Sequence, residues 1–220
     1  MIASFLSNST ILIQGTVLTL QLWLMSLCVS LVVGTLLGIA ESDKSGCSKA
    51  FQIPLRALTR MIRAIPFYLQ LLIIYFVLPM CTGADLSAFT ASVIALGFCS
   101  SAYVSQIVRG GLLAYDQNLW EMTQLLGYTR LQALRYLVVP QVFRANLLAL
   151  SGEVDQLIKT TAVCSTIGVL ETMGTVRNVI AREMNPITMY LGAAVIFMCL
   201  SLAWSGIVTL LQQRMSCARN

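Results

Sequence analysis

The sequence has 220 residues, of which 57% are hydrophobic and only 10% are charged, and its net charge is +5. Soluble domains usually carry about 25% charged residues, so this composition excludes an ordinary soluble globular protein and indicates one all-α integral membrane domain. The basic residues lie between apolar runs and form no patch interleaved with aromatic residues, which argues against nucleic-acid binding.

The first apolar run, from about Ile11 to Ala40, is long enough to span a bilayer. No basic residue precedes it, and the first charged residue is Glu41, so we expect a retained helix with its N-terminus outside and not a secretory signal. Gly34 and Gly38 lie one turn apart and form a small-residue face, which favours close packing of a neighbouring helix over a ligand contact.

Four further spans are predicted after a basic connection, which makes about five in all and puts the two termini on opposite sides. They run from about Ile65 to Met80, Leu86 to Val108, Ala145 to Leu170 and Pro186 to Leu211. The polar segment from Thr172 to Asn185, before the last span, is interpreted as either a short surface helix or a plain connection.

The basic residues test this topology, because cytoplasmic segments carry an excess of Lys and Arg. Only Arg177 and Arg182 fall outside, and Lys159 lies within the fourth span. The remaining eleven of the fourteen fall in segments assigned to the cytoplasm: Lys44, Lys49, Arg56, Arg60, Arg63, Arg109, Arg130, Arg135, Arg144, Arg214 and Arg219. The asymmetry predicts an N-terminus outside the cytoplasmic membrane and a C-terminus in the cytoplasm.

The cytoplasmic loop from about Gly110 to Arg144 is too long for a simple connection. Asn118 followed by Glu121 fits an N-cap with its partner three residues later, which predicts a short helix over Leu119–Leu126 that Gly127 ends.

A second helix is predicted where Thr129 and Gln132 repeat the capping pattern, and Pro140 must interrupt or end it. Trp120, Leu125 and Leu126 give the first helix apolar surface. This surface fits an interfacial helix under its own bundle or a docking element for a soluble partner.

The fourth span contains three charges that insertion into a bilayer disfavours. Asp155 and Lys159 are one helical turn apart and are expected to form an ion pair. Glu153, Gln156 and Thr160 form a separate polar stripe, which either fixes helix packing or lines a substrate pathway.

The third span also carries polar residues at helical spacing. Ser101 and Ser105 share one face, and Tyr103 and Gln106 share another. They are candidates for the same substrate pathway, although Ser and Gln also bridge helices. With no histidine and no Cys-x-x-Cys pair among seven cysteines, no metal site is expected.

The loop resembles the "EAA" loop of bacterial ABC importer permeases. The pattern Glu-Ala-Ala, three residues, Gly, nine residues, Ile-x-Leu-Pro is matched in spacing by Glu121-Met122-Thr123, Gly127 and Leu137–Pro140. Met122 and Thr123 depart from the two alanines, and Leu137 and Val139 replace Ile and Leu.

Further strings, in order along nearly the whole chain, are similar to the polar amino-acid permease family. They are Arg63–Pro66, Leu69–Leu71, Tyr75–Pro79, Ser101–Tyr103, Ile107–Gly111, Leu157–Thr161 and Ile167–Glu171, with Gln106 where the family usually has Glu.

The resemblance implies a subunit of an amino-acid importer that works with a second permease copy or a paralogue. Two cytoplasmic ATPase subunits, which bind ATP and Mg, would dock on the loops, and an extracytoplasmic binding protein would deliver the amino acid. The chain has no Gly-x-x-x-x-Gly-Lys-Ser/Thr phosphate loop, so we expect neither ATP hydrolysis nor a cofactor on this subunit.

Two other classes of function are compatible with a helical membrane protein. A secondary transporter would need coupling carboxylates at mid-membrane, for which Glu153 and Asp155 leave room, but it would not need a capped docking loop. A membrane enzyme would need a catalytic cluster, and the sequence has no nucleophile–base arrangement.

Overall fold

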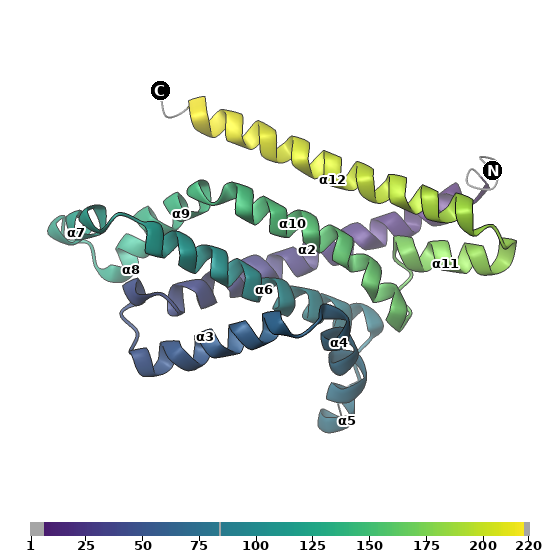
Figure 1. Ribbon diagram of the computed structural model, residues 1–220, viewed down its shortest axis with the longest axis horizontal. Helices are drawn as coiled ribbons and strands as arrows, with labels where there is room; N and C mark the ends of the chain where they lie inside the picture. The colour runs from purple at the N-terminus through teal and green to yellow at the C-terminus, as the bar shows by residue number, and fades with distance from the viewer. Residues whose placement is uncertain (1–6, 84, 218–220) are drawn as a thin grey trace. The chain divides into compact units, whose positions relative to one another are not determined.

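The computed structural model describes residues 7–83 and 85–217, and these residues form helices and short connections without a strand. The all-α fold is therefore confirmed (Figure 1). The helices run in this order: α2 (Ser9–Ala40), α3 (Lys49–Ala64), α4 (Phe67–Leu72), α5 (Leu78–Thr82), α6 (Ala88–Ala114), α7 (Gln117–Leu125), α8 (Arg130–Ala133), α9 (Val139–Ala145), α10 (Leu147–Thr160), α11 (Thr172–Glu183) and α12 (Pro186–Cys217). Short 3-10 or π-helical stretches separate or extend some of them: η1 (Asp43–Ser45), η2 (Ile73–Val77), η3 (Leu134–Val138) and η4 (Thr161–Ile167).

Three described helices, α2, α6 and α12, are each long and apolar enough to cross a membrane. The pair formed by α3 and the stretch from α4 to α5 adds a fourth only if it is counted as one bent span. The first and fifth predicted spans correspond to α2 and α12. The third span is longer than predicted, because α6 continues beyond Val108 to Ala114.

The predicted fourth span consists of two kinds of helix, α10 and the tighter η4, which ends at Gly168 with a φ of 90°. The hydroxyl groups of Thr160 and Thr161 donate to carbonyl groups three or four residues earlier, as do those of Ser165 and Thr166. Such side-chain bonds offer the carbonyl groups a second donor beside the helical ladder.

The basic connection after the first span holds an element that the sequence analysis missed. Residues 49–64 form the sixteen-residue helix α3, which begins after the N-cap Ser48. Its four basic residues fall on one face, so they mark an amphipathic helix and not a loop.

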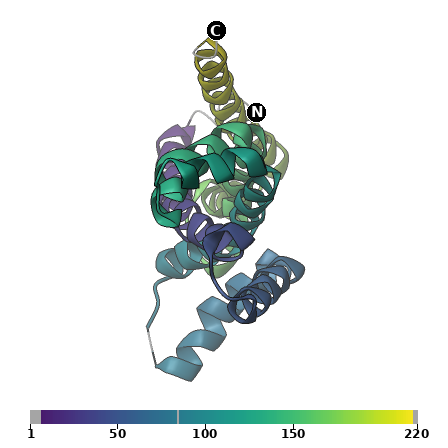
Figure 2. The ribbon, with the colours of Figure 1, turned by 90° about the vertical axis from the view of Figure 1, so that its left-hand side faces the viewer.

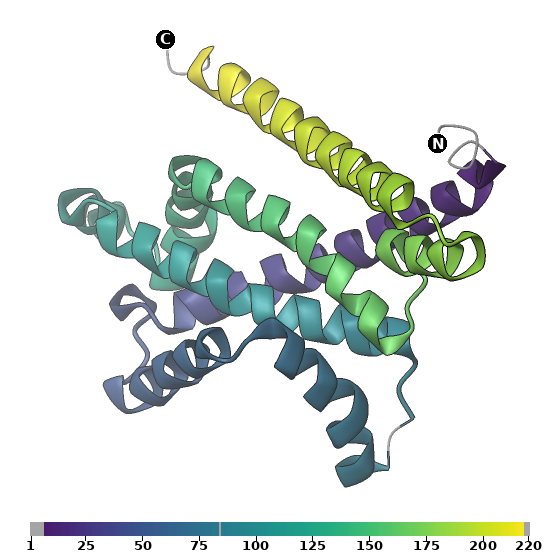
Figure 3. The same cartoon turned by 45° about the vertical axis from the view of Figure 1, so that its right-hand side comes forward.

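The chain divides into two compact units. The first comprises residues 1–28, 66–97 and 154–207, and the second comprises residues 29–65, 98–153 and 208–220. In the first unit, Leu22, Leu71, Leu96 and Cys164 belong to one buried cluster. A second cluster of this unit joins the start of α2, α11 and the start of α12, which lie beside one another in Figures 1 and 3.

The segment before the last span is the helix α11, so the interpretation as a plain connection is wrong, and the interpretation as a surface helix is right about the helix but not about its position. It is packed more deeply than a surface helix, because Val176 is buried in the second cluster. Glu171 caps its N-terminus by accepting from the backbone N–H groups of Met173 and Gly174 at 2.9 and 2.8 Å.

In the second unit, the last turns of α2 pack closely on α6. A Cβ atom on Gly34 would lie 2.6 Å from Val104 Cβ, and one on Gly38 would lie 2.8 Å from the carbonyl oxygen of Ser105. The prediction that these glycines allow a close helix contact is therefore confirmed.

Candidate functional site

The first helix of the loop between α6 and α10, α7, begins two residues earlier than predicted. Its N-cap is Asp116, whose Oδ1 accepts from the backbone N–H of Asn118 at 2.8 Å. The assignment of Asn118 as the cap was wrong, because the adjacent Asp-Gln-Asn run offers two competing capping residues. Glu121 consequently lies in the second turn, where it accepts from Gln117 Nε2 at 3.2 Å.

The helix ends as predicted at a glycine in the left-handed region. Gly127 has a φ of 80°, and Tyr128 N–H donates back to the carbonyl of Thr123 at 3.2 Å. A Cβ atom on Gly127 would meet nothing within 4 Å. The turn therefore requires glycine for its backbone conformation and not for space.

The second loop helix, α8, has the predicted capping box. The Thr129 hydroxyl accepts from Gln132 N–H at 3.3 Å, and Gln132 Oε1 accepts from Thr129 N–H at 2.9 Å. The helical path then loosens into the π-helical η3 directly before Pro140, which stands in the first turn of α9. The predicted interruption at Pro140 is confirmed, since proline has no N–H to continue the ladder. Figure 2 views the molecule from the side of this loop.

The exposed surface of the loop is strongly apolar. Leu125 is 86% exposed, Leu126 71% and Leu131 75%. Trp120, in contrast, is buried, so it does not share the exposed surface on which the sequence placed it. Spacing along α7 could not show which side of this short helix the rest of the unit would cover.

The buried side of α7 is held by Lys44, from the turn that follows α2. Its Nζ donates to the carbonyl of Tyr115 at 2.6 Å and lies 4.9 Å from the ring centroid of Tyr115 and 5.9 Å from that of Trp120. Burial lowers the pKa of Lys44, and the carboxylate of Asp116 acts in the opposite direction. From the sequence, Lys44 was expected only to contribute to the orientation, because no local pattern pairs it with residues 71 or more positions away.

The candidate pathway residues on α6 separate into two groups. Ser101 and Ser105 are buried, and the Ser105 hydroxyl donates to Glu41 Oε1 at 3.0 Å. Tyr103 and Gln106 are exposed and share a face, as predicted; Gln106 accepts from Arg63. A role of these four residues in substrate passage stays a prediction.

Glu153 lies at the end of a chain of hydroxyl groups in the second unit. Ser30 donates to Ser100 at 2.8 Å, and Ser100 donates to Glu153 Oε1 at 2.7 Å. Ser30 and Ser100 were not among the predicted site residues, although serine in an apolar span is itself a signal of a polar partner.

The other candidate residues of α10, from Asp155 to Thr160, lie in the first unit. Gln156 is exposed, and its carbonyl accepts from the Thr160 hydroxyl at 2.8 Å. The predicted ion pair is confirmed: Lys159 Nζ lies 2.6 Å from Asp155 Oδ2. The two side chains are 51% and 28% exposed, so the pair lies at the surface of this subunit.

A buried network on α2 and α11 was also missed. Thr19 is fully buried, and its hydroxyl is 2.8 Å from that of Thr172 and 3.4 Å from Glu171 Oε2. This network ties α11 to α2 within the first unit.

Comparison with known proteins places these features in a family. Residues 30–216 match the family model described as binding-protein-dependent transport system inner membrane component. The chain is 31% identical over 206 residues to the glutamine transport system permease protein GlnP of Escherichia coli strain K12, covering 93% of each chain. It is 29% identical over 204 residues to a putative GlnP of Rickettsia conorii, covering 93% of this chain and 92% of the relative.

The fold is shared with solved transporters. An amino acid ABC transporter solved with histidines has a TM-score of 0.85 at 29% identity, covering 96% of this chain and 97% of the other. The methionine ABC transporter MetNI, in an inward-facing conformation, has a TM-score of 0.73 at 17% identity over 93% of this chain and 97% of the other, which supports the fold alone. The chain belongs to the family of binding-protein-dependent transport system inner membrane components.

Proposed function

We propose that this chain is the permease subunit of an ATP-driven importer that moves a polar amino acid across the bacterial cytoplasmic membrane. The substrate class is supported by the names of the relatives, which are glutamine permeases, and by the amino acid ABC transporter of similar fold. Selection among polar amino acids would fall largely to a separate binding protein.

The observation that carries the proposal is the geometry of the loop around Gly127. Two capped helices are joined through a glycine turn, one side is held to the rest of the unit through Lys44, and the other side exposes Leu125, Leu126 and Leu131. An apolar surface of this kind on a fixed element suits docking to a soluble protein. We assign it to an ATPase subunit, so that nucleotide-driven movement reaches the spans mechanically.

The partners follow from this assignment. Two ATPase subunits, which bind ATP and Mg, would dock on the loops of two permease chains, either identical copies or paralogues. A second permease and lipid would also cover α12, since only 6% of its most apolar stretch is buried within this chain. A binding protein would supply substrate from outside.

The orientation is proposed from the distribution of basic residues. The loop from residues 110 to 144 carries Arg130, Arg135 and Arg144, which supports a position in the cytoplasm, where an ATPase could dock. The start of α2 and the helix α11 then lie toward the outside.

Reconstitution with the cognate ATPase and binding protein tests the function directly. We expect ATP-dependent uptake of glutamine or another polar amino acid into vesicles, and none when the ATPase is omitted. The same uptake driven by an ion gradient without the ATPase would contradict the importer and favour a secondary transporter.

A further inference from the structure

Helix α3 is amphipathic in the reverse sense of a helix on a soluble protein. Its buried residues are polar, Gln52 and Thr59, whereas Phe51, Leu58 and Met61 are exposed. A helix that turns its polar face toward its own protein needs an apolar environment on the other side.

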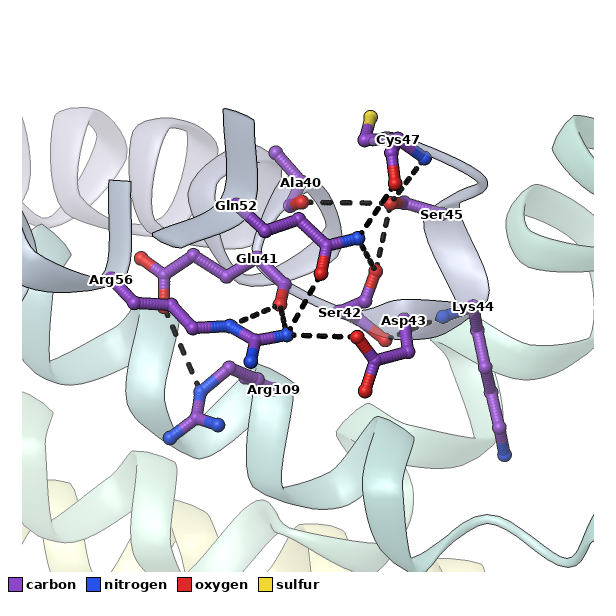
Figure 4. Close-up of polar contacts among 10 residues, drawn as sticks. All are labelled: Ala40, Glu41, Ser42, Asp43, Lys44, Ser45, Cys47, Gln52, Arg56 and Arg109. Carbon is purple, nitrogen blue, oxygen red and sulfur yellow. Dashed lines mark hydrogen bonds and ion pairs between the residues drawn. The ribbon is translucent and has the colours of Figure 1, made fainter. Parts of the chain in front are cut away.

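Specific contacts fix this orientation (Figure 4). Arg56 Nε donates to the carbonyl of Glu41 at 2.8 Å, and its Nη2 lies 3.1 Å from Asp43 Oδ1. Gln52 Nε2 donates to the carbonyl groups of Ser42 and Cys47 at 3.2 and 3.0 Å. These bonds tie the polar face of α3 to the turn that follows α2.

That turn is itself anchored on α6. Glu41 is buried, its Oε1 accepts from Ser105, and its Oε2 lies 3.6 Å from Arg109 Nε (Figure 4). Near the other end of α3, Arg63 donates to Gln106 on α6. Both ends of α3 are thus attached through polar groups, and α3 cannot turn its apolar face inward without breaking these contacts.

The exposed face has the dimensions and charges of a helix that lies on a bilayer. Sixteen residues extend about 24 Å, which is shorter than the ~30 Å hydrocarbon core of a bilayer. At 100° per residue, Lys49 and Arg60 lie together along one edge of the apolar strip, and both are exposed. Within the described part of the chain, neither forms a salt bridge.

We propose that α3 lies in the cytoplasmic leaflet, with Phe51, Leu58 and Met61 among the acyl chains and with Lys49 and Arg60 on anionic phospholipid headgroups. The placement in this leaflet rests on the proposed orientation of the chain. A second permease copy would present the same two cations and is a poorer match than an anionic leaflet, which supplies both apolar chains and negative charge.

The test uses the full-length chain in vesicles, with Phe51→Trp as the reporter and the parent protein as the fluorescence background. The vesicles are phosphatidylcholine alone or an equal mixture with phosphatidylglycerol, and either lipid carries bromine near the headgroup end of its chains. We expect bromine to quench the added tryptophan, since interfacial helices bury their apolar face about 5–10 Å deep. Leu125→Trp, on the exposed loop surface, is the matched control and should stay unquenched.

The charge assignment is tested with K49Q and R60Q in the Phe51→Trp background. Each cation near the membrane surface should enrich anionic lipid around α3 on the order of fivefold. Brominated phosphatidylglycerol should therefore quench the tryptophan better than brominated phosphatidylcholine, and K49Q and R60Q should remove this difference. Equal quenching by the two lipids in the parent reporter would overturn the anionic-lipid assignment.

If Phe51→Trp does not fold, Leu58→Trp serves as a second reporter on the same apolar face of α3. A tryptophan at either position that bromine does not quench would overturn the proposal, and disulfide crosslinking of Leu58→Cys between two chains would then identify a second copy as the occupant. Neither measurement needs transport or an ATPase, so its outcome is independent of the importer assay.

Discussion

Valine substitutions at Gly127 and at Gly110 separate two effects: the positive φ that the loop turn requires and the size of the added side chain. A Cβ atom would meet nothing within 4 Å at either position, but only Gly127 has a positive φ. Gly127→Val should cost about 1–2 kcal/mol in the turn and displace the exposed leucines. We expect normal membrane insertion and at least severalfold less substrate uptake per ATP hydrolysed in reconstituted vesicles.

Gly110→Val adds the same side chain to a helical position and should leave uptake near the parent value. Normal uptake by Gly127→Val at normal expression would mean that the turn does not transmit movement.

Glu121→Lys is expected to weaken ATPase co-purification, since it reverses a charge beside the exposed surface of α7.

Lys44 is expected to stabilise the attachment of α7 to the turn after α2. Lys44→Met removes the bond to the Tyr115 carbonyl and the contacts with two aromatic rings, at a cost of about 1–3 kcal/mol. Amide hydrogen exchange over residues 117–125 should then be roughly tenfold faster. Lys44→Arg retains the cation and should recover most of the protection, and an unchanged exchange rate in Lys44→Met would show that other contacts hold α7.

The ion pair on α10 is predicted to matter for insertion and folding. Lys159→Met leaves the Asp155 carboxylate unpaired, so the amount of folded protein should fall. Adding Asp155→Leu removes the remaining charge and should recover part of it. The measurement is monodisperse protein by fluorescence-detected size exclusion, and a double variant no better than Lys159→Met would contradict the pairing explanation.

At the level of helices, α2 and α6 pack closely because Gly34 has no side chain to keep their backbones apart. A side chain on Gly34 would collide with Val104 and with the carbonyl oxygen of Ser101, which cannot move away. We expect Gly34→Leu to cost more than about 3 kcal/mol and to abolish folded protein. Gly206→Leu, on α12 where nothing lies within 4 Å, is the matched control and should express normally.

Across the chain, the two termini are predicted to lie on opposite sides of the membrane. Membrane-impermeant labelling of Ser7→Cys in a cysteine-free background should occur in intact cells, and a C-terminal reporter should be active only in the cytoplasm. Arg219, which is one of the eleven basic residues assigned to the cytoplasm, and Asn220 lie outside the described residues. Labelling of both ends from one side would reject the five-span topology.

The sequence alone determined the features that depend on neighbours a few residues away. Hydrophobic runs predicted the long helices α2, α6 and α12, and local capping chemistry predicted the Thr129 box and the Gly127 turn. The Asp155–Lys159 pair was also predictable, because one helical turn brings its members together.

Only the tertiary structure decided which faces are covered and which distant groups meet. Glu41 and Ser105 are 64 residues apart in the chain, and Ser30 and Ser100 are 70 apart, so no local pattern pairs them. Trp120 turned inward for the same reason. The basic residues of helix α3 already have helical spacing, so the helix itself could have been predicted. Only the tertiary structure decided that its polar face turns toward the protein, because Arg56 and Gln52 bond to the turn after α2 that Glu41 anchors on α6.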